Sequence, residues 1–169
     1  MGSGKTTVGK SLAKKLGFRF IDMDDFIENH QGKTINEIFS EKGEGAFRLL
    51  ENKTLQEIST LENVVISTGG GAPCFYDNME MMNKTGFTVY LKVSPEELAK
   101  RLSICKESRP LLKDKTPHEM VAFISGNIEK RESYYNQAKL IFDAEQMLIS
   151  TDVNNIVNNL MLYLPQNKQ

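Results

Sequence analysis

Cysteine is scarce in this chain of 169 residues, which has two, Cys74 and Cys105. They lie far apart and lack the close spacing that is typical of a metal site, so we interpret both as ordinary thiols of a reducing compartment. Long apolar runs are also missing, because no run approaches the roughly 20 residues that a membrane-spanning helix needs. The first residues contain no hydrophobic signal-peptide region. Together these absences predict a cytoplasmic protein with no membrane partner.

A strong net charge of either sign is absent as well. The chain has 21 basic and 22 acidic residues, which gives a net charge of −1, and this balance does not indicate a nucleic-acid partner. No internal repeat divides the sequence. A chain of this length suits one compact domain, so we predict a single domain over residues 1–169.

The order of the predicted elements indicates the fold class. Segments rich in β-branched and aromatic residues are expected to form strands, and they lie at 18–22, 63–68, 87–93 and 139–142. Helical stretches are expected between and after them, at 6–16, 43–61, 76–83, 95–104, 117–137 and 152–163. Strands that alternate with helices predict a parallel sheet covered on both faces, in a three-layer α/β/α arrangement.

The first residues, MGSGKTT, match the second half of a phosphate-binding loop. Its full pattern is G-x-x-x-x-G-K-S/T, and Gly4, Lys5 and Thr6 occupy the last three positions. The first glycine of the pattern falls ahead of Met1. Since such a loop follows a strand that is normally central in its sheet, we expect about 6–10 further residues before Met1, forming that strand and ending in a glycine-containing turn.

Each residue type in this loop suits phosphate binding. Gly2 and Gly4 let the backbone turn tightly and direct N–H groups at phosphate oxygens. Lys5 supplies a charge for the β- and γ-phosphates, the Thr6 hydroxyl suits Mg²⁺, and the following helix contributes its N-terminal dipole. A chance match to so short a pattern is the alternative, and the helix expected directly after the loop argues against it.

Two carboxylates follow the first predicted strand, in the sequence DMDD. Asp22 and Asp24 are two residues apart, so they face the same side of an extended segment. They lie at the carboxyl end of a strand, where open α/β sheets bind ligands. One of them could hold Mg²⁺ through water while the other accepts a proton from a substrate hydroxyl. Alternatively, either residue caps the next helix.

The sequence STGGGAP follows the next strand. Its three consecutive glycines, Gly69, Gly70 and Gly71, are costly to order and indicate a backbone that closely approaches a substrate. The alternative is a flexible turn before the helix at 76–83. The placement of the glycines at the same sheet edge as the two aspartates favours a binding site.

Three arginines complete the candidate site. Arg48 lies on a helix with Glu51 one turn further on as a possible partner, and Arg131 lies near the end of another helix. If these two converge on one pocket, their planar guanidinium groups predict a carboxylate-bearing acceptor. Arg109 lies in a charged stretch at about 105–117 whose composition suits a lid, which would close an arginine over a transferring phosphoryl group. Taken singly, each arginine is more often a plain surface charge.

These motifs, in this order and at these spacings, resemble the shikimate kinase family. They are GSGKTT at 2–7, D-x-D at 22–24, F-R-x-x-E at 47–51, GGG at 69–71, RPLL at 109–112, and KR at 130–131 with Tyr135 following. The likeness extends from Gly2 to about Phe142, and the combination is far more specific than G-K-T alone. It implies a P-loop kinase of the nucleoside-monophosphate-kinase fold. Such an enzyme transfers the γ-phosphoryl group of ATP to the 3-hydroxyl of shikimate, in the pathway to chorismate and the aromatic amino acids.

For the nucleotide, the resemblance implies ATP with Mg²⁺ as the cofactor. The nucleotide-binding residues would be Gly2, Ser3, Gly4, Lys5, Thr6, Thr7, Arg101 and Arg109. Lys5 and the lid residue Arg109 would also act in catalysis, and Arg101 would pack near the adenine. Thr6 would bind the metal directly and Asp22 would act on it through water. After Phe142 the sequence does not align cleanly with the family, so we name no adenine-contacting residue there.

For the acceptor, the resemblance assigns the remaining candidates. Asp24 would bind and activate the hydroxyl. Arg48 and Arg131 would hold the carboxylate, and Gly69 to Gly71 would line the pocket. We expect a monomer that binds ATP and shikimate.

Two other functions stay open from the sequence. Another small-metabolite kinase of the same fold, such as a gluconate kinase, would also use two arginines for a carboxylate, although Asp24 with the glycines and Arg48 favours shikimate. A non-catalytic nucleotide-binding module is the other alternative. Such a module would be expected to have lost Asp24 or Arg109, and both are present.

Overall fold

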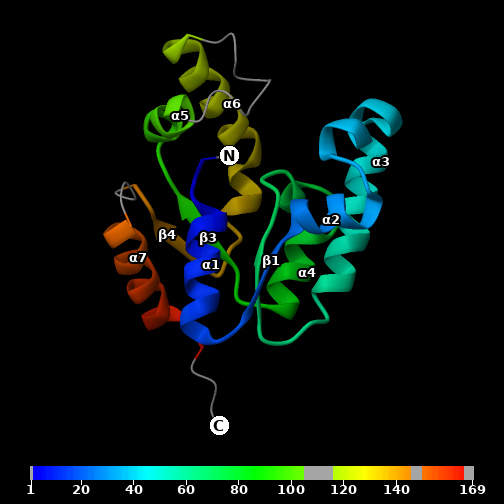
Figure 1. Cartoon of the computed structure of the whole chain (residues 1–169). Helices are drawn as coiled ribbons and strands as arrows, with labels where there is room; N and C mark the ends of the chain where they lie inside the picture. Colours follow the sequence, from blue (N-terminus) through cyan, green and yellow to red (C-terminus); the bar gives the residue numbers. More distant parts are fainter. Residues whose placement is uncertain (1, 105–115, 146–149, 166–169) are drawn as a thin grey trace.

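The computed structural model describes residues 2–104, 116–145 and 150–165. Strands and helices alternate along this part of the chain, as predicted (Figure 1). The strands are β1 (Arg19–Asp22), β2 (Val64–Ser67), β3 (Val89–Lys92) and β4 (Leu140–Asp143). The helices are α1 (Lys5–Leu16), α2 (Met23–Gln31), α3 (Ile35–Ile58), α4 (Asn78–Thr85), α5 (Pro95–Ile104), α6 (Pro117–Tyr135) and α7 (Ser150–Tyr163), with a 3-10 turn η1 (Ala72–Cys74).

The strands pair in parallel, which confirms the predicted direction. β1 pairs with β2, so that Ile21 lies opposite Ile66, and β3 pairs with β4, so that Leu91 lies opposite Phe142. In the described part of the chain no ladder joins these pairs, so the strands form two parallel pairs rather than one continuous sheet. The further central strand expected ahead of Met1 stays a prediction.

Helix α1 begins directly after the glycine-containing loop. Gly2 and Gly4 have φ values of 76° and 84°, in the left-handed region that glycine adopts without a Cβ penalty. Gly17 closes the helix with φ of 70° and donates its N–H to Lys14 O, as the sequence predicts for a C-cap. Helix α1 packs on β1 and β2 and beside α7.

The region between β1 and β2 contains more helix than the sequence patterns predict. Helix α2 was not expected as an element, and α3 begins at Ile35 rather than near residue 43. Thr34 and Glu37 form a capping box at its start, with Thr34 N–H donating to Glu37 Oε2 at 2.7 Å. The predicted start coincides with a kink at Gly43, where φ is 77°. A glycine in this conformation interrupts the apolar periodicity, so the pattern reveals only the second part of the helix.

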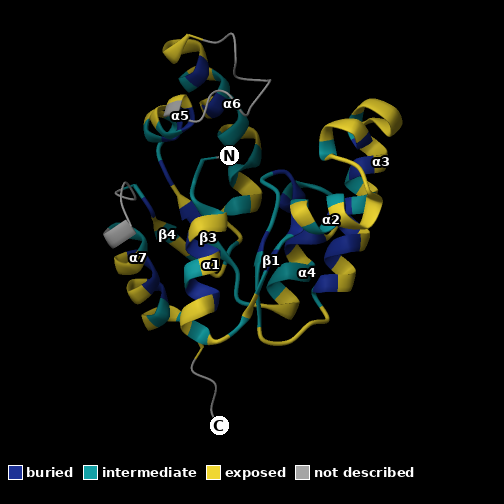
Figure 2. Ribbon diagram, viewed as in Figure 1, coloured by how far each residue is buried: buried dark blue, intermediate teal, exposed yellow. Residues whose placement is uncertain are grey.

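Two groups of buried apolar side chains form the core. The first lies around α1, β3, α5, α6 and α7 and includes Val8, Leu12, Leu91, Leu102, Met120, Val157 and Leu160. The second lies around β1, α2, α3 and η1 and includes Ile21, Met23, Ile27, Phe47, Leu55, Ile58 and Ala72. The helices carry exposed residues on their outer sides (Figure 2). None of the described helices is both long and apolar enough to cross a membrane.

Candidate active site

The carboxylate of Asp22 connects the phosphate loop to the start of α2. Its Oδ2 accepts a hydrogen bond from the Thr6 hydroxyl at 2.8 Å, and its Oδ1 accepts one from Asp24 N–H at 3.2 Å. Asp22 therefore does cap α2, which was one of the two alternatives from the sequence. The cap uses Oδ1 and leaves Oδ2 beside the Thr6 hydroxyl. Asp22 can therefore cap α2 and also lie next to Thr6, the proposed metal ligand.

Asp24 lies in the first turn of α2, between the loop lysine and the glycine loop, which we define as Gly69–Gly71. Burial raises the pKa of Asp24 above its ordinary value, the Asp22 carboxylate raises it further, and the nearby charge of Lys5 opposes the rise. A carboxyl group with a raised pKa is a stronger base once it is ionised. The electrostatics of this position therefore suit proton removal from a hydroxyl group.

The glycine loop is closely packed against charged side chains. A Cβ atom on Gly69 would lie 3.0 Å from Asp24 Oδ1 and 3.0 Å from Glu51 Oε1. A Cβ atom on Gly71 would lie 2.7 Å from the Arg48 Nη1. The absence of side chains is what lets these charged groups approach the loop.

Arg48 projects from α3 and is held on several sides. Its Nη1 donates to Glu51 Oε2 at 2.5 Å and its Nη2 donates to Glu44 Oε1 at 3.0 Å. Its guanidinium carbon lies 4.3 Å from the centre of the Phe75 ring, within cation–π range. Burial raises the pKa of Glu51, and the hydrogen bond and charge of Arg48 oppose that rise. The pair is thus a largely buried ion pair that fixes the guanidinium group beside Gly71.

Arg131 reaches the same region from α6. Its positive charge acts on Glu51, on Cys74 and on the Tyr135 hydroxyl, in each case lowering a pKa that burial raises. Arg48 acts on Glu51 and on Cys74 in the same way. Helix α6, which carries Arg131, packs against η1, so the charges of the two arginines act on the same groups although the two helices are far apart in sequence.

Arg101 lies elsewhere, at the carboxyl end of β4. Its Nε donates to Glu97 Oε1 at 2.9 Å, and its Nη2 donates to the carbonyl oxygens of Ala144 and Glu145 at 2.9 and 2.7 Å. The structure does not bring it to the acceptor residues. The other predicted nucleotide arginine, Arg109, and most of the predicted lid at 105–117 lie outside the described residues.

Sequence reasoning underrated two residues of this cluster. Glu51 was considered only as a partner of Arg48, yet it also lies against Gly69 and beside Arg131. Tyr135 was noted only as part of a motif, yet its hydroxyl donates to Gly70 O at 2.6 Å. Tyr135 follows Arg131 by one helical turn, and this i,i+4 spacing is the signal that could have placed both on one face.

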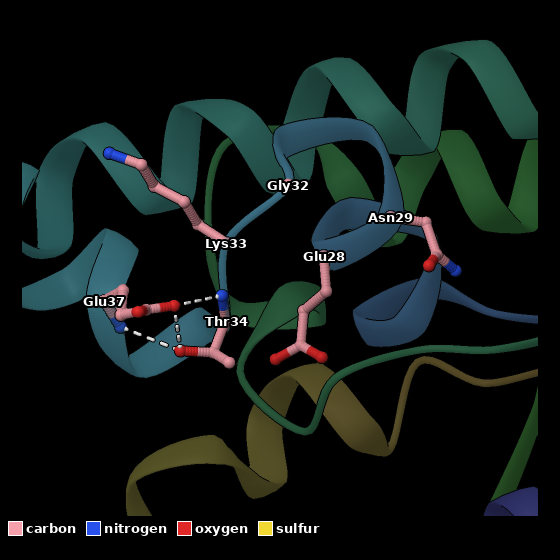
Figure 3. A pocket seen from close by; sticks show the side chains of 6 residues that line it. All are labelled: Glu28, Asn29, Gly32, Lys33, Thr34 and Glu37. Carbon is pink, nitrogen blue, oxygen red and sulfur yellow. Dashed lines mark hydrogen bonds between the residues drawn. The ribbon is translucent and has the colours of Figure 1, made fainter.

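A hollow of about 360 Å³ lies between the end of α2 and the start of α3 (Figure 3). Its lining residues are Glu28, Asn29, Gly32, Lys33, Thr34 and Glu37. None of them is a predicted site residue, and two of its carboxylates already accept backbone hydrogen bonds, Glu37 from Thr34 and Glu28 from Ile35. This hollow shares no lining residue with the cluster around the glycine loop.

Comparison with known proteins gives one consistent family. The family model for shikimate kinase matches residues 1–161. A shikimate kinase from Parabacteroides distasonis is 56% identical over 164 residues, covering 97% of this chain and 95% of that protein. A shikimate kinase from Bacteroides thetaiotaomicron is 54% identical over 147 residues, covering 87% and 84%.

Solved structures agree with these sequence matches and confirm the predicted fold class. The crystal structure of the shikimate kinase from Bacteroides thetaiotaomicron matches with a TM-score of 0.93 and 50% identity, covering 97% of this chain and 94% of that chain. The shikimate kinase from Acinetobacter baumannii in complex with shikimate matches with a TM-score of 0.81 and 32% identity, covering 100% and 91%. The chain therefore belongs to the shikimate kinase family and is an ATP-dependent small-molecule kinase.

Proposed function

We propose that this chain transfers the γ-phosphoryl group of ATP to the 3-hydroxyl of shikimate. The observation that carries the proposal is that Asp24 and Arg48 lie against the glycine loop, with Lys5 of the phosphate loop close to Asp24 and with α6, which carries Arg131, packed against η1. The arrangement offers two cations for a carboxylate and one base for a hydroxyl, directly beside a phosphate-binding loop. The similar Acinetobacter baumannii enzyme was solved in complex with shikimate.

On the acceptor side, the positively and negatively charged residues would have different roles. Arg48 and Arg131 would hold the substrate carboxylate, since guanidinium groups match its two oxygens. Asp24 would accept the hydroxyl proton as the oxygen attacks the γ-phosphorus. Gly69 and the following glycines would bring the backbone against the ring of the acceptor.

On the nucleotide side, the loop before α1 would hold the phosphates. The residues assigned to it are Gly2, Ser3, Gly4, Lys5, Thr6 and Thr7. Their backbone N–H groups and the N-terminus of α1 favour anions, and Lys5 adds a charge at the β- and γ-phosphates. Arg101 would pack near the adenine, and Arg109 would act on the transferring group from the lid.

The oxygen atoms of Thr6 and Asp22 fit Mg²⁺. They lie 2.8 Å apart, and among the described residues there is no group of three or more His, Cys, Asp or Glu that could hold a metal by itself. This sparse set suits Mg²⁺, which is usually bound by one or two protein oxygens together with substrate phosphates and waters. When bound, the ion would supply positive charge to the phosphates. Thr6 would contact it directly, and Asp22 would hold it through water.

A side-by-side assay tests the proposed substrate. The protein is mixed with MgATP and, separately, with shikimate, gluconate or each nucleoside monophosphate, and ADP release is followed by a coupled reaction. We expect ADP release with shikimate well above the rate without an acceptor, and little with the others. A higher rate with gluconate would assign the site to another metabolite, and no rate with any acceptor would support a non-catalytic module.

We further propose that the enzyme is a cytoplasmic monomer.

A further inference from the structure

The carbonyl groups along the glycine loop are all taken up by the protein itself. Gly69 O accepts from Ala72 N–H at 3.2 Å, and Gly71 O accepts from Cys74 N–H at 2.9 Å. Gly70 O accepts from the hydroxyl of Tyr135 at 2.6 Å. In the described part of the chain, no acceptor is found for the N–H groups of Gly70 and Gly71. The loop therefore turns its acceptors inward and keeps its donors available.

One of these bonds comes from a distant element, and it fixes a whole peptide plane. In a planar trans peptide, the C=O of Gly70 and the N–H of Gly71 point in opposite directions. Holding Gly70 O against Tyr135 thus also sets the direction of the Gly71 N–H. Three glycines in a row have little steric preference of their own, so such a plane could rotate at low cost without the bond.

Tyr135 is itself well placed to hold this plane. Its ring lies 5.0 Å from that of Tyr90 on β3, centre to centre. Burial raises the pKa of the Tyr135 hydroxyl, and a hydrogen bond and the positive charge of Arg131 oppose that rise. The hydroxyl consequently stays protonated at neutral pH and can donate. Because Tyr135 and Arg131 are one helical turn apart on α6, the same turn supplies a proposed carboxylate ligand and the tie to the loop.

The far end of the loop has a second tie, made of buried amides. Asn78 is fully buried and donates to Ala72 O at 2.8 Å. Asn52 donates in turn to Asn78 Oδ1 at 2.8 Å, which links α3 to the start of α4. Each of these buried amides therefore has a hydrogen-bond partner, as buried polar groups require. The series of bonds anchors η1, so the bond from Tyr135 acts on a loop whose C-terminal end is already fixed.

We propose that Tyr135 is a positioning residue of the acceptor site, because its hydroxyl fixes the peptide plane between Gly70 and Gly71. This inference rests on the proposed function of the glycine loop as part of the acceptor pocket. With the plane fixed, the N–H of Gly71 is held in one direction beside the Arg48 guanidinium group. Without the hydroxyl, the acceptor would have to order the loop as it binds, which weakens its binding.

Tyr135→Phe tests the proposal by removing one oxygen atom and leaving the ring beside Tyr90. We expect the KM for shikimate to rise about 3- to 10-fold, the range of one ordinary hydrogen bond, while the KM for ATP changes by less than about twofold. Tyr134→Phe, at the exposed neighbouring position, is the matched control and should change neither value. A KM for shikimate that stays at the parent value, or an equal rise in both KM values, would overturn the proposal.

A second measurement does not depend on the substrate. Amide hydrogen exchange of the segment that contains the glycine loop is compared in the ligand-free parent, Tyr135→Phe and Tyr134→Phe. Exchange at Ala72 and Cys74, whose N–H groups donate to Gly69 O and Gly71 O, should be at least about threefold faster in Tyr135→Phe only, since a local opening that loses a hydrogen bond becomes easier. Unchanged exchange would contradict the role of Tyr135. If the parent did not phosphorylate shikimate, the proposed function would fail, yet faster exchange would still support the tie to the loop.

Discussion

Asp24 shows, at the scale of a single residue, a side chain held where its charge is unfavourable. Replacing it by Asn keeps the shape and removes the proton acceptor. We expect turnover to fall by about 100-fold or more, the usual scale for a lost general base. ATP binding should stay near that of the parent, because Asp24 is assigned to the acceptor. Steady-state kinetics with titration of ATP checks both, and turnover within a few-fold of the parent would rule out Asp24 as the base.

The same substitution should raise stability. The pKa of Asp24 is higher in the folded state than its ordinary value of 3.8, with burial as the main cause. The ionised carboxylate therefore costs folding free energy at neutral pH, and that cost is lost as the pH falls and Asp24 is protonated in both states. Thermal unfolding of Asp24→Asn should give a higher Tm than the parent at neutral pH, with the difference shrinking on acidification. An equal or lower Tm at neutral pH would contradict this environment.

Arg131 and Arg48 should respond differently to truncation. Arg131→Ala should raise the KM for shikimate by about 10- to 100-fold with little change for ATP, because one charge-assisted contact is lost. Arg131→Lys should lie in between, since it keeps the charge and loses the planar fork. Arg48→Ala should also destabilise the fold, because it leaves Glu51, which is 1% exposed, as a buried charge without its partner. A loss of ATP affinity in Arg131→Ala would move this residue out of the acceptor pocket.

At the scale of elements, Gly71→Ala tests the close packing of the glycine loop. The backbone of Gly71, with φ of −87°, accepts an alanine, so the whole effect comes from the added methyl group 2.7 Å from Arg48 Nη1. We expect the guanidinium group to shift and the KM for shikimate to rise about 10-fold or more. Gly45→Ala on α3 is the matched control, because nothing lies within 4 Å of its added Cβ. Equal KM values for the two variants would show that Arg48 moves aside freely.

The elements also show how far the sequence could lead. The strands and most helices could be predicted from the pattern of apolar residues and from the glycines that end the elements. Both features reflect local backbone preference together with burial. Helix α2 was missed because the two residues at its start, the N-cap Asp22 and Asp24 in its first turn, were interpreted as site residues. Asp22 caps the helix that carries Asp24, and this is compatible with the roles proposed for both in the site. Contacts such as that of Tyr135 with Gly70, which are 65 positions apart, depend on tertiary packing that no local pattern contains.

At the scale of the whole molecule, the candidate active site takes residues from helices of both groups of buried apolar side chains. Leu55 belongs to the group around α2 and α3 and Leu160 to the group around α1 and α7, and each is 1% exposed. Leu55→Ala and Leu160→Ala should each cost about 2–5 kcal/mol of unfolding free energy. Both variants should still unfold in one denaturant transition, because α1 packs on β1 and β2 while its apolar face belongs to the other group. Two separate transitions would contradict the single-domain prediction.

The position of the two arginines has a mechanical consequence. Arg48 stands on α3, whose apolar side chains belong to one core group, and Arg131 stands on α6, whose apolar side chains belong to the other. A substrate carboxylate held by both arginines would act as a reversible cross-link between α3 and α6. The force needed to pull α3 away from α6 should then be greater with the acceptor bound than without it.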